Sequence, residues 1–254
     1  MGSDDGCVTD ARLGQAELDE LWDHGDAAES ERRFRAAEEA ETRGDAVRAE
    51  LATQRARALG LQGRYDEAEV VLDGIPALGP LVRTRVDLER GRIRLSSGDP
   101  ADAVPLFMSA LESAREADSP FLAVDAMHML ALSDPGKEDH WTRLALVELR
   151  RTDDHRTQRW QIALHNNLGW HHFDAGHAAT ALEEFAAALV AARDYGTSDQ
   201  RFMGEWTVAR GLRELGRDVE ALAIQRRLAA ERPDDPDVAA EIAALTDAAP
   251  TIEE

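Results

Sequence analysis

The chain has 254 residues, and its 50 acidic and 29 basic residues give it a formal net charge of −21. Nucleic acids and anionic membranes attract basic surfaces, so this charge argues against both as partners. The single cysteine, Cys7, excludes an intrachain disulfide, and no stretch has the pattern of a signal peptide or a membrane span. We therefore expect a cytoplasmic protein.

Apolar residues recur at intervals of three and four along most of the chain, a spacing that predicts helices and almost no β-structure. The short, polar ends, residues 1–10 and 247–254, are expected to be disordered. Between them we predict one helical domain over residues 11–246. Its helices are expected at 11–23, 26–42, 45–61, 64–75, 80–97, 100–117, 120–133, 136–152, 156–175, 178–195, 199–215, 218–232 and 236–246.

Four dipeptides mark helix starts within this domain. They are Asp99-Pro100, Ser119-Pro120, Asp134-Pro135 and Asp235-Pro236. Each places a side chain that can cap a helix before a proline, the residue favoured at the first helical position. The dipeptides are thus predicted to separate helices and not domains.

One pattern is repeated six times along the chain. It contains a small residue on the second helix of each pair, at Ser30, Ala68, Ala103, His140, Ala181 and Ala221, with intervals of 38, 35, 37, 41 and 40 residues. The clearest copy reads Asn167, Leu168, Gly169, Phe173, Gly176, Ala181, Phe185, Ala188 and Leu189. This spacing and these residues resemble the tetratricopeptide repeat (TPR), more weakly in the first and fourth copies.

The resemblance implies where each recurring residue of the pattern lies. Gly169 and Ala181 are expected where the two helices of a hairpin approach most closely, and Gly176 in the tight turn between them. Phe185 is expected to fill the space against the next hairpin. The implied fold is all-α: a right-handed helical solenoid of about six antiparallel hairpins with a C-terminal capping helix.

In TPR proteins the first helix of each hairpin lines a concave groove that binds ligands. Projected onto this chain, that face carries six arginines and three acids and is near +3: Arg12, Arg57, Arg85, Arg92, Arg210, Arg213, Asp19, Glu50 and Asp125. Arginine suits carboxylates because its planar fork donates two parallel hydrogen bonds. We expect an acidic segment or a C-terminal carboxylate to bind Arg57, Arg85, Arg92, Arg210 and Arg213. The alternative is that these arginines pair with acids on neighbouring helices.

Aromatic residues form a second candidate site. Trp170 and Trp206 fall on the inward line of adjacent hairpins, near Asn166, Asn167 and Arg210. Tryptophan and arginine are enriched in the hot spots of protein interfaces. The alternative is that the two tryptophans pack between the helices of successive hairpins.

More specific binding chemistry is not supported by the sequence. His165, His171, His172 and His177 cluster, but no zinc-binding motif accompanies them, and we predict neither a metal nor another cofactor. The two-carboxylate clamp of some chaperone-binding TPR domains is matched by Asn167 alone. The positions that should complete the clamp hold Asp125, Met129, Met203 and Thr207.

No motif of a catalytic nucleophile, phosphate loop or dinucleotide site is found, so we do not expect an enzyme. The predicted function is a non-enzymatic scaffold or adaptor that binds a protein or peptide in an arginine-bearing concave groove. Two alternatives stay open. One is a self-associating structural protein, such as a homodimer formed through the first and fourth hairpins. The other is a regulatory domain that senses a peptide or small ligand for a separate effector.

Overall fold

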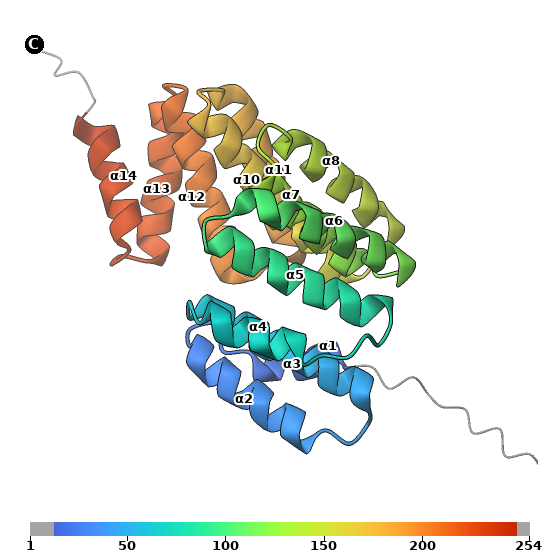
Figure 1. Cartoon of the computed structure of the whole chain (residues 1–254). Helices are drawn as coiled ribbons and strands as arrows, with labels where there is room; N and C mark the ends of the chain where they lie inside the picture. Colours follow the sequence, from blue (N-terminus) through green and yellow to red (C-terminus); the bar gives the residue numbers. More distant parts are fainter. Residues whose placement is uncertain (1–12, 248–254) are drawn as a thin grey trace, which may run out of the picture. The chain divides into compact units, whose positions relative to one another are not determined.

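The computed structural model describes residues 13–247, and every regular element in that range is a helix. In Figure 1 the helices follow one another in chain order, joined by short connections. The fold is therefore all-α, as the spacing of the apolar residues predicts. Of the predicted terminal segments 1–10 and 247–254, residues 1–10 and 248–254 lie outside the described residues, whereas Asp247 is the last residue of the final helix.

The chain divides into two compact units, and the division follows Pro135, inside the fourth predicted hairpin. The N-terminal unit contains α1 (Gln15–Leu21), α2 (Ala27–Ala40), α3 (Asp45–Leu61), α4 (Tyr65–Asp73), α5 (Pro80–Ser96), α6 (Pro100–Glu116) and α7 (Pro120–Ser133). The C-terminal unit contains α8 (Glu138–Glu148), the 3-10 helix η1 (Leu149–Arg151), α9 (His155–Gln158), α10 (Trp160–Asp174), α11 (Ala178–Tyr195), α12 (Ser198–Glu214), α13 (Asp218–Glu231) and α14 (Pro236–Asp247).

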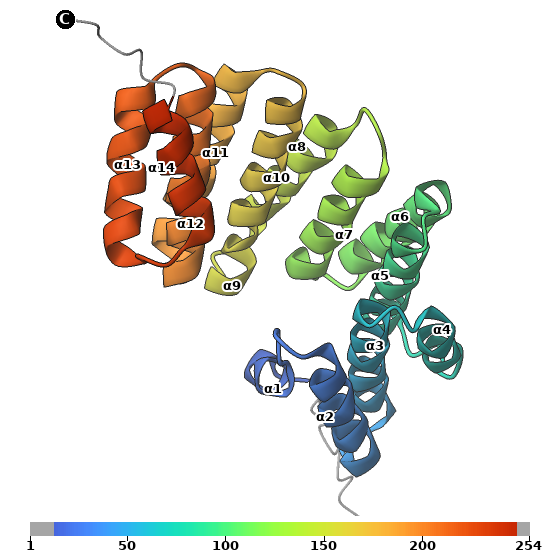
Figure 2. The ribbon, with the colours of Figure 1, turned by 90° about the vertical axis from the view of Figure 1, so that its left-hand side faces the viewer.

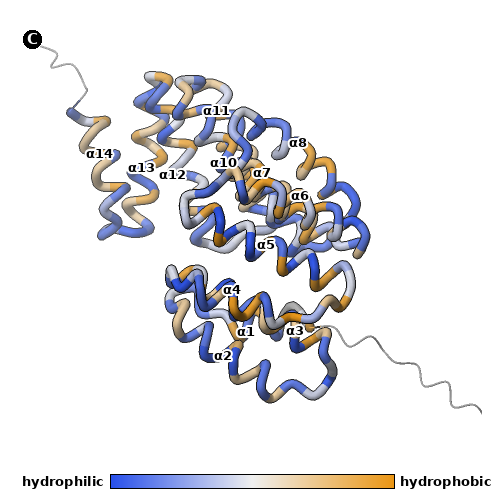
Figure 3. Tube along the Cα trace, viewed as in Figure 1, coloured by the Kyte–Doolittle hydropathy of each residue, from blue (hydrophilic) through white to orange (hydrophobic). Residues whose placement is uncertain are grey.

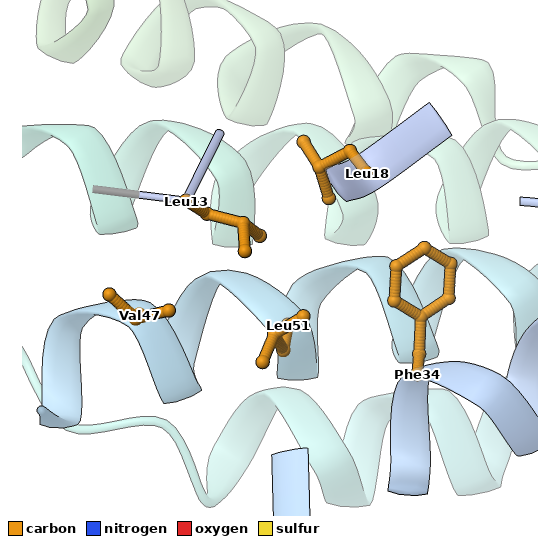
Figure 4. Close-up of a cluster of buried hydrophobic side chains, with 5 residues drawn as sticks. All are labelled: Leu13, Leu18, Phe34, Val47 and Leu51. Carbon is orange, nitrogen blue, oxygen red and sulfur yellow. The ribbon is translucent and has the colours of Figure 1, made fainter. Parts of the chain in front are cut away.

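Within the N-terminal unit each helix packs on the next one along the chain, as α2 does on α3 and α5 on α6. Figure 4 shows the first hydrophobic cluster, in which Leu13 and Leu18 face Phe34, Val47 and Leu51. A second cluster joins α3, α4 and α5, and its buried members are Ala56, Leu59, Ala68, Leu72 and Ile93. The hydrophobic core thus lies between consecutive helices, because a single hairpin cannot bury both of its faces.

The C-terminal unit is built in the same way, and Figure 2 shows its helices α10 to α14 side by side. Its last helices are joined by two apolar clusters, one around Phe202, Leu228 and Val238 and one around Leu212, Ala221 and Leu245. Figure 3 shows hydrophobic and hydrophilic residues interleaved along the helices of both units. Helix α7 is an exception, because it buries every residue from Leu122 to Met127.

At two positions a phenylalanine ring lies so close to the backbone that only glycine fits. A Cβ atom added to Gly169 would lie 2.5 Å from the ring of Phe185, and one added to Gly91 would lie 2.4 Å from that of Phe107. The predicted close approach at Gly169 is confirmed. The ring of Phe185 fills it from within the same hairpin, and it also lies close to Gly211 on α12.

The small residues of the repeat are buried in five of the six copies. Ala68, Ala103, Ala181 and Ala221 are fully buried, and so is Ser30, whose hydroxyl accepts a hydrogen bond from the Asp23 backbone N–H. In the fourth copy His140 is exposed, so its assignment to this position is wrong. Helix α8 buries Trp141 and Ala145 instead, because its register is set by the large indole.

The turns between the paired helices have one geometry. Gly63, Gly98, Gly176 and Gly216 all have positive φ, and the residue after each glycine donates its N–H to a carbonyl five residues earlier. For Gly176 the hydrogen bond runs from His177 N to His172 O, at 2.8 Å. The predicted role of Gly176 is confirmed, since residues with a Cβ rarely adopt this conformation.

The helix starts differ from the prediction in several places. Pro100, Pro120 and Pro236 begin helices, but α8 begins at Glu138 because Gly136 adopts positive φ after Pro135. The Asp235 carboxylate accepts hydrogen bonds from the first turn of α14, whereas the side chains of Asp99 and Ser119 cap no helix. Their backbone N–H groups close the preceding helices instead, and this tight turn fixes their conformation.

The helix predicted at 156–175 is interrupted near its start. It is divided into α9 and α10 at Arg159. The Asp154 carboxylate accepts a hydrogen bond from Thr157 N at 2.8 Å, and the Gln158 amide donates to the carbonyls of Leu149 and Thr152. These bonds anchor α9 to the preceding loop and separate it from the regular helix that follows.

Candidate binding surface

The predicted arginines of the N-terminal unit lie on α3 and α5, and carboxylates of neighbouring helices meet them. Arg85 Nε lies 3.2 Å from Glu50 Oε2 on α3, and Arg92 Nη2 donates to Asp125 Oδ1 on α7 at 2.6 Å. Arg92 also donates to Glu89, one turn earlier on α5. All three carboxylates are buried. The alternative of pairing with neighbouring acids is thus what the structure shows for Arg85 and Arg92.

Arg57 is held less closely than the other two arginines. Its Nη1 atom lies 4.0 Å from Glu89 Oε1, and its guanidinium carbon lies 5.9 Å from the centre of the Trp22 ring. The neighbouring Arg92 and burial lower the pKa of Arg57. Arg57 is therefore the arginine of this cluster with the weakest carboxylate contact.

The charged groups of this cluster shift one another's pKa values. Burial alone lowers the pKa of Arg92, but attraction to Asp125 and Glu89 outweighs burial and raises it above the ordinary value. Burial alone would raise the pKa of Asp125. The attraction of its carboxylate to Arg92 and Arg57 has the larger effect, so the pKa of Asp125 is lowered. With Arg57, Arg85 and Arg92 facing three carboxylates, this part of the surface has no net formal charge.

The arginines of the C-terminal unit meet one carboxylate on the last helix. Arg213 donates two hydrogen bonds to Glu241, from Nε at 2.9 Å and from Nη2 at 3.2 Å, and Arg210 Nη1 lies 3.4 Å from the same carboxylate. Glu241 lies on α14 and is buried. Arg210 also stands over the ring of Phe173 on α10, at 5.2 Å.

The predicted tryptophans come together. The ring centres of Trp170 on α10 and Trp206 on α12 are 6.4 Å apart, with their planes tilted by 40°. Trp170 also makes edge contacts with Phe173 and Phe185, and Trp206 packs against the cluster of Phe202, Leu228 and Val238. Both rings are half-buried, so they pack between successive helices and still reach the surface.

One buried polar group on this surface, the Nε1 of Trp206, has no hydrogen-bond partner within residues 13–247. The side chain of Asn166 is half-buried. Asn166 and Trp206 both lie fifteen residues before the alanine of their repeat, so they hold equivalent places on α10 and α12. Asn167, next to Asn166, is half-buried as well. We call the group Asn166, Asn167, Trp170, Trp206 and Arg210 the aromatic line.

Two histidines of the predicted cluster lie near carboxylates. His165 Nδ1 lies 2.6 Å from Glu184 Oε2, and His172 Nε2 lies 3.5 Å from Asp139 Oδ2. His172 is buried, as expected for a residue at a core position. In the part of the chain that the structure describes, no three His, Cys, Asp or Glu side chains are grouped so that they could hold a metal ion.

Two acids that complete these contacts were missing from the predicted sites, Glu89 and Glu241. Glu89 lies between the positions projected onto the inward face, although its place three residues before Arg92 indicates a shared side of α5. Glu241 belongs to the capping helix, which was not projected at all. Its position between Val238, Ile242 and Leu245 on the apolar side of that helix was the available signal.

Each helix in the described range is too short or too polar to cross a bilayer. Comparison with models of known protein families gives no match, and neither does comparison with curated protein sequences. The crystal structure of BtubC (BKLC) from P. vanneervenii is similar to this chain, with a TM-score of 0.60 and 15% sequence identity. The similarity covers 93% of this chain and 95% of that one. At this identity it supports the all-α fold and nothing more specific.

Proposed function

We propose that this chain is a non-enzymatic scaffold or adaptor of the TPR type, and that the aromatic line on α10 and α12 binds a protein or peptide. The observation that carries the proposal is the contact of Trp170 with Trp206, 6.4 Å between ring centres, on two half-buried rings. Such rings offer a large apolar contact area to a partner at little cost in conformational entropy.

The polar groups beside the rings suit a peptide backbone. A buried N–H without an acceptor costs about 1–3 kcal/mol, and the Nε1 of Trp206 is such a donor. A small rotation of the ring toward a bound carbonyl would remove this cost. The amide of Asn166, which can both donate and accept, lies at the equivalent place on the neighbouring helix.

The arginines contribute less to this proposal than their number suggests. Arg85 and Arg92 already hold buried carboxylates, so an acidic ligand would have to replace an existing pair. Arg57, with a 4.0 Å contact to Glu89, is the arginine of the N-terminal unit best placed for an acidic segment. We therefore expect apolar contacts to dominate binding and acidic contacts to add to it.

A selection from a random peptide library on the immobilised full-length chain tests the proposal. Selected peptides should carry aromatic or aliphatic anchors and should bind the Trp170→Leu, Trp206→Leu double variant at least about tenfold more weakly. Leucine keeps the packing apolar, so the fold is retained. Trp160→Leu is the matched control, since it makes the same change on α10 away from the aromatic line.

The salt response separates the two kinds of contact. Binding through the tryptophans should persist as the NaCl concentration rises, because salt screens charges and not apolar contacts. The proposal is wrong if no peptide is selected, or if the double variant binds the selected peptides as wild type does.

A further inference from the structure

Helix α14 packs on α12 and α13 through one side. Val238 and Leu245 are buried and Ile242 is partly buried, so apolar side chains follow Val238 after four and after seven residues. Ile242 and Val238 belong to the same cluster as Trp206. This is the arrangement in which an amphipathic helix lies in an apolar groove of a partner.

A charged contact lies in the middle of this apolar side. Glu241 receives the paired hydrogen bonds of Arg213 and lies 3.4 Å from Arg210. Arg210 is held in place by the Phe173 ring of α10. The surface of α12 and α13 under α14 therefore selects a helix that presents a carboxylate between apolar residues.

The contacts that keep α14 in its place stabilise it only modestly. The helix has 12 residues, a length that is marginal for a helix by itself, and four of its exposed residues are alanines. Within the described residues its packing partners are α12 and α13. A free helix with the same pattern would make the same contacts and could take its place.

We propose that the surface formed by α12 and α13 is a helix-binding site, that α14 is its internal occupant, and that a partner helix with a carboxylate flanked by apolar residues displaces α14. The proposal rests on the proposed function in one respect: Trp206 belongs both to the aromatic line and to the cluster under α14, so displacement would enlarge the exposed aromatic surface. It adds the chemistry of a partner and a means of regulation.

The test uses the full-length chain and a fluorescein-labelled synthetic peptide of residues 233–247. In the Glu241→Gln chain the internal helix is held less tightly while Arg210 and Arg213 are unchanged. The labelled peptide should bind this chain about tenfold more tightly than it binds wild type. Asp237→Asn is the matched control, because it removes the same charge from an exposed place on α14, and it should leave peptide affinity unchanged.

Two further measurements make the outcome specific. A peptide with the Glu241→Gln change should bind the same chain about tenfold more weakly than the wild-type peptide. Peptide binding should also increase amide hydrogen exchange in residues 236–247 of the chain. Equal peptide affinity for wild type and Glu241→Gln, or binding without increased exchange in α14, overturns the proposal. The library selection uses other peptides and the Trp170 and Trp206 variants, so either proposal can fail alone.

Discussion

At the scale of single residues, Gln225 is the most unusual side chain of the core. It lies four residues after Ala221, where the other second helices carry Phe34, Leu72, Phe107 or Phe185. The Gln225 side chain is fully buried, and neither its Oε1 nor its Nε2 has a hydrogen-bond partner in the described part of the chain. A buried amide in this state opposes folding.

We predict that Gln225→Leu stabilises the C-terminal unit by about 1–3 kcal/mol, because it removes the cost of the buried amide. Leucine fits, since Leu72 fills the same position in the second repeat, where Ala56 stands in the place of Ala209. Thermal and urea unfolding measure the change. Gln225→Phe is the comparison and should gain less, because the rings of Phe107 and Phe185 lie against a glycine at the place where Ala209 stands. Equal or lower stability of the leucine variant would contradict the prediction.

We expect His128 on α7 to make the stability of the N-terminal unit depend on pH. Burial lowers the pKa of His128, with Arg92 and Arg57 adding to the effect and Asp125 opposing it. The unfolded chain therefore takes up a proton at higher pH than the folded chain. The contribution of neutral His128 to the free energy of unfolding is complete above the pKa of the unfolded chain, about 6.5. It is lost as the pH falls from there toward the pKa of the folded chain.

We predict that the melting temperature falls between about pH 7.5 and about pH 5.5, and falls less in His128→Gln. The pKa values of Asp125 and Asp154 are lowered, so these acids titrate below this range. His24→Gln is the control, since His24 is exposed in the same unit. A His128→Gln chain with the full pH dependence of wild type would show that another group is responsible.

At the scale of helices, the first helices of successive repeats are linked by ion pairs in which the carboxylate is buried. Arg85 links α5 to α3, Arg92 links α5 to α7, and Arg213 links α12 to α14. Between α10 and α12 the link is the pair of tryptophans. The contact of Trp170 with Trp206 is thus the one of these four links that is made by two aromatic rings and not by an ion pair.

We predict that Arg92→Leu destabilises the N-terminal unit by about 3–5 kcal/mol, because it leaves Asp125 and Glu89 buried without their cation. Arg94→Leu, two residues later on α5, removes a more exposed pair with Glu69 and should cost about 0–1 kcal/mol. Urea unfolding of the two variants gives the comparison. Similar losses in both would mean that the Arg92 network adds nothing beyond a surface pair.

Helix positions could be predicted because they depend on local spacing. Gly176 and the prolines at 100, 120 and 236 act within a few residues, and their roles follow from backbone geometry. Ion partners could not be predicted in the same way. Glu241 reaches Arg213 from 28 residues away, through a helix whose apolar side decides where the carboxylate lies. The assignment of His140 to the small-residue position was wrong because spacing alone does not show that Trp141 sets the register of α8.

At the scale of the whole chain, 50 acids against 29 basic residues leave a large net negative charge. The buried pairs are screened little by salt, and the exposed pairs contribute little to stability. Mutual repulsion of the excess acids should therefore be the charge effect that salt changes most.

We predict that the melting temperature rises as NaCl increases from about 20 mM to about 200 mM, where the Debye length shortens from about 20 Å to about 7 Å. Differential scanning calorimetry measures it. Sucrose at equal osmolality is the control, because it does not screen charge. A fall in melting temperature over this range would mean that ion pairs outweigh the repulsion.

The four glycine turns have a consequence for how such a chain changes length in evolution. Each turn needs a carbonyl at the end of one helix, a glycine, and the N–H of the next residue, and it uses no side chain of the helices that it joins. Recombination between two gene copies at the codons of Gly63 and Gly98, or of Gly176 and Gly216, would rebuild an intact turn. The segment gained or lost by such recombination would then be the second helix of one hairpin together with the first helix of the next.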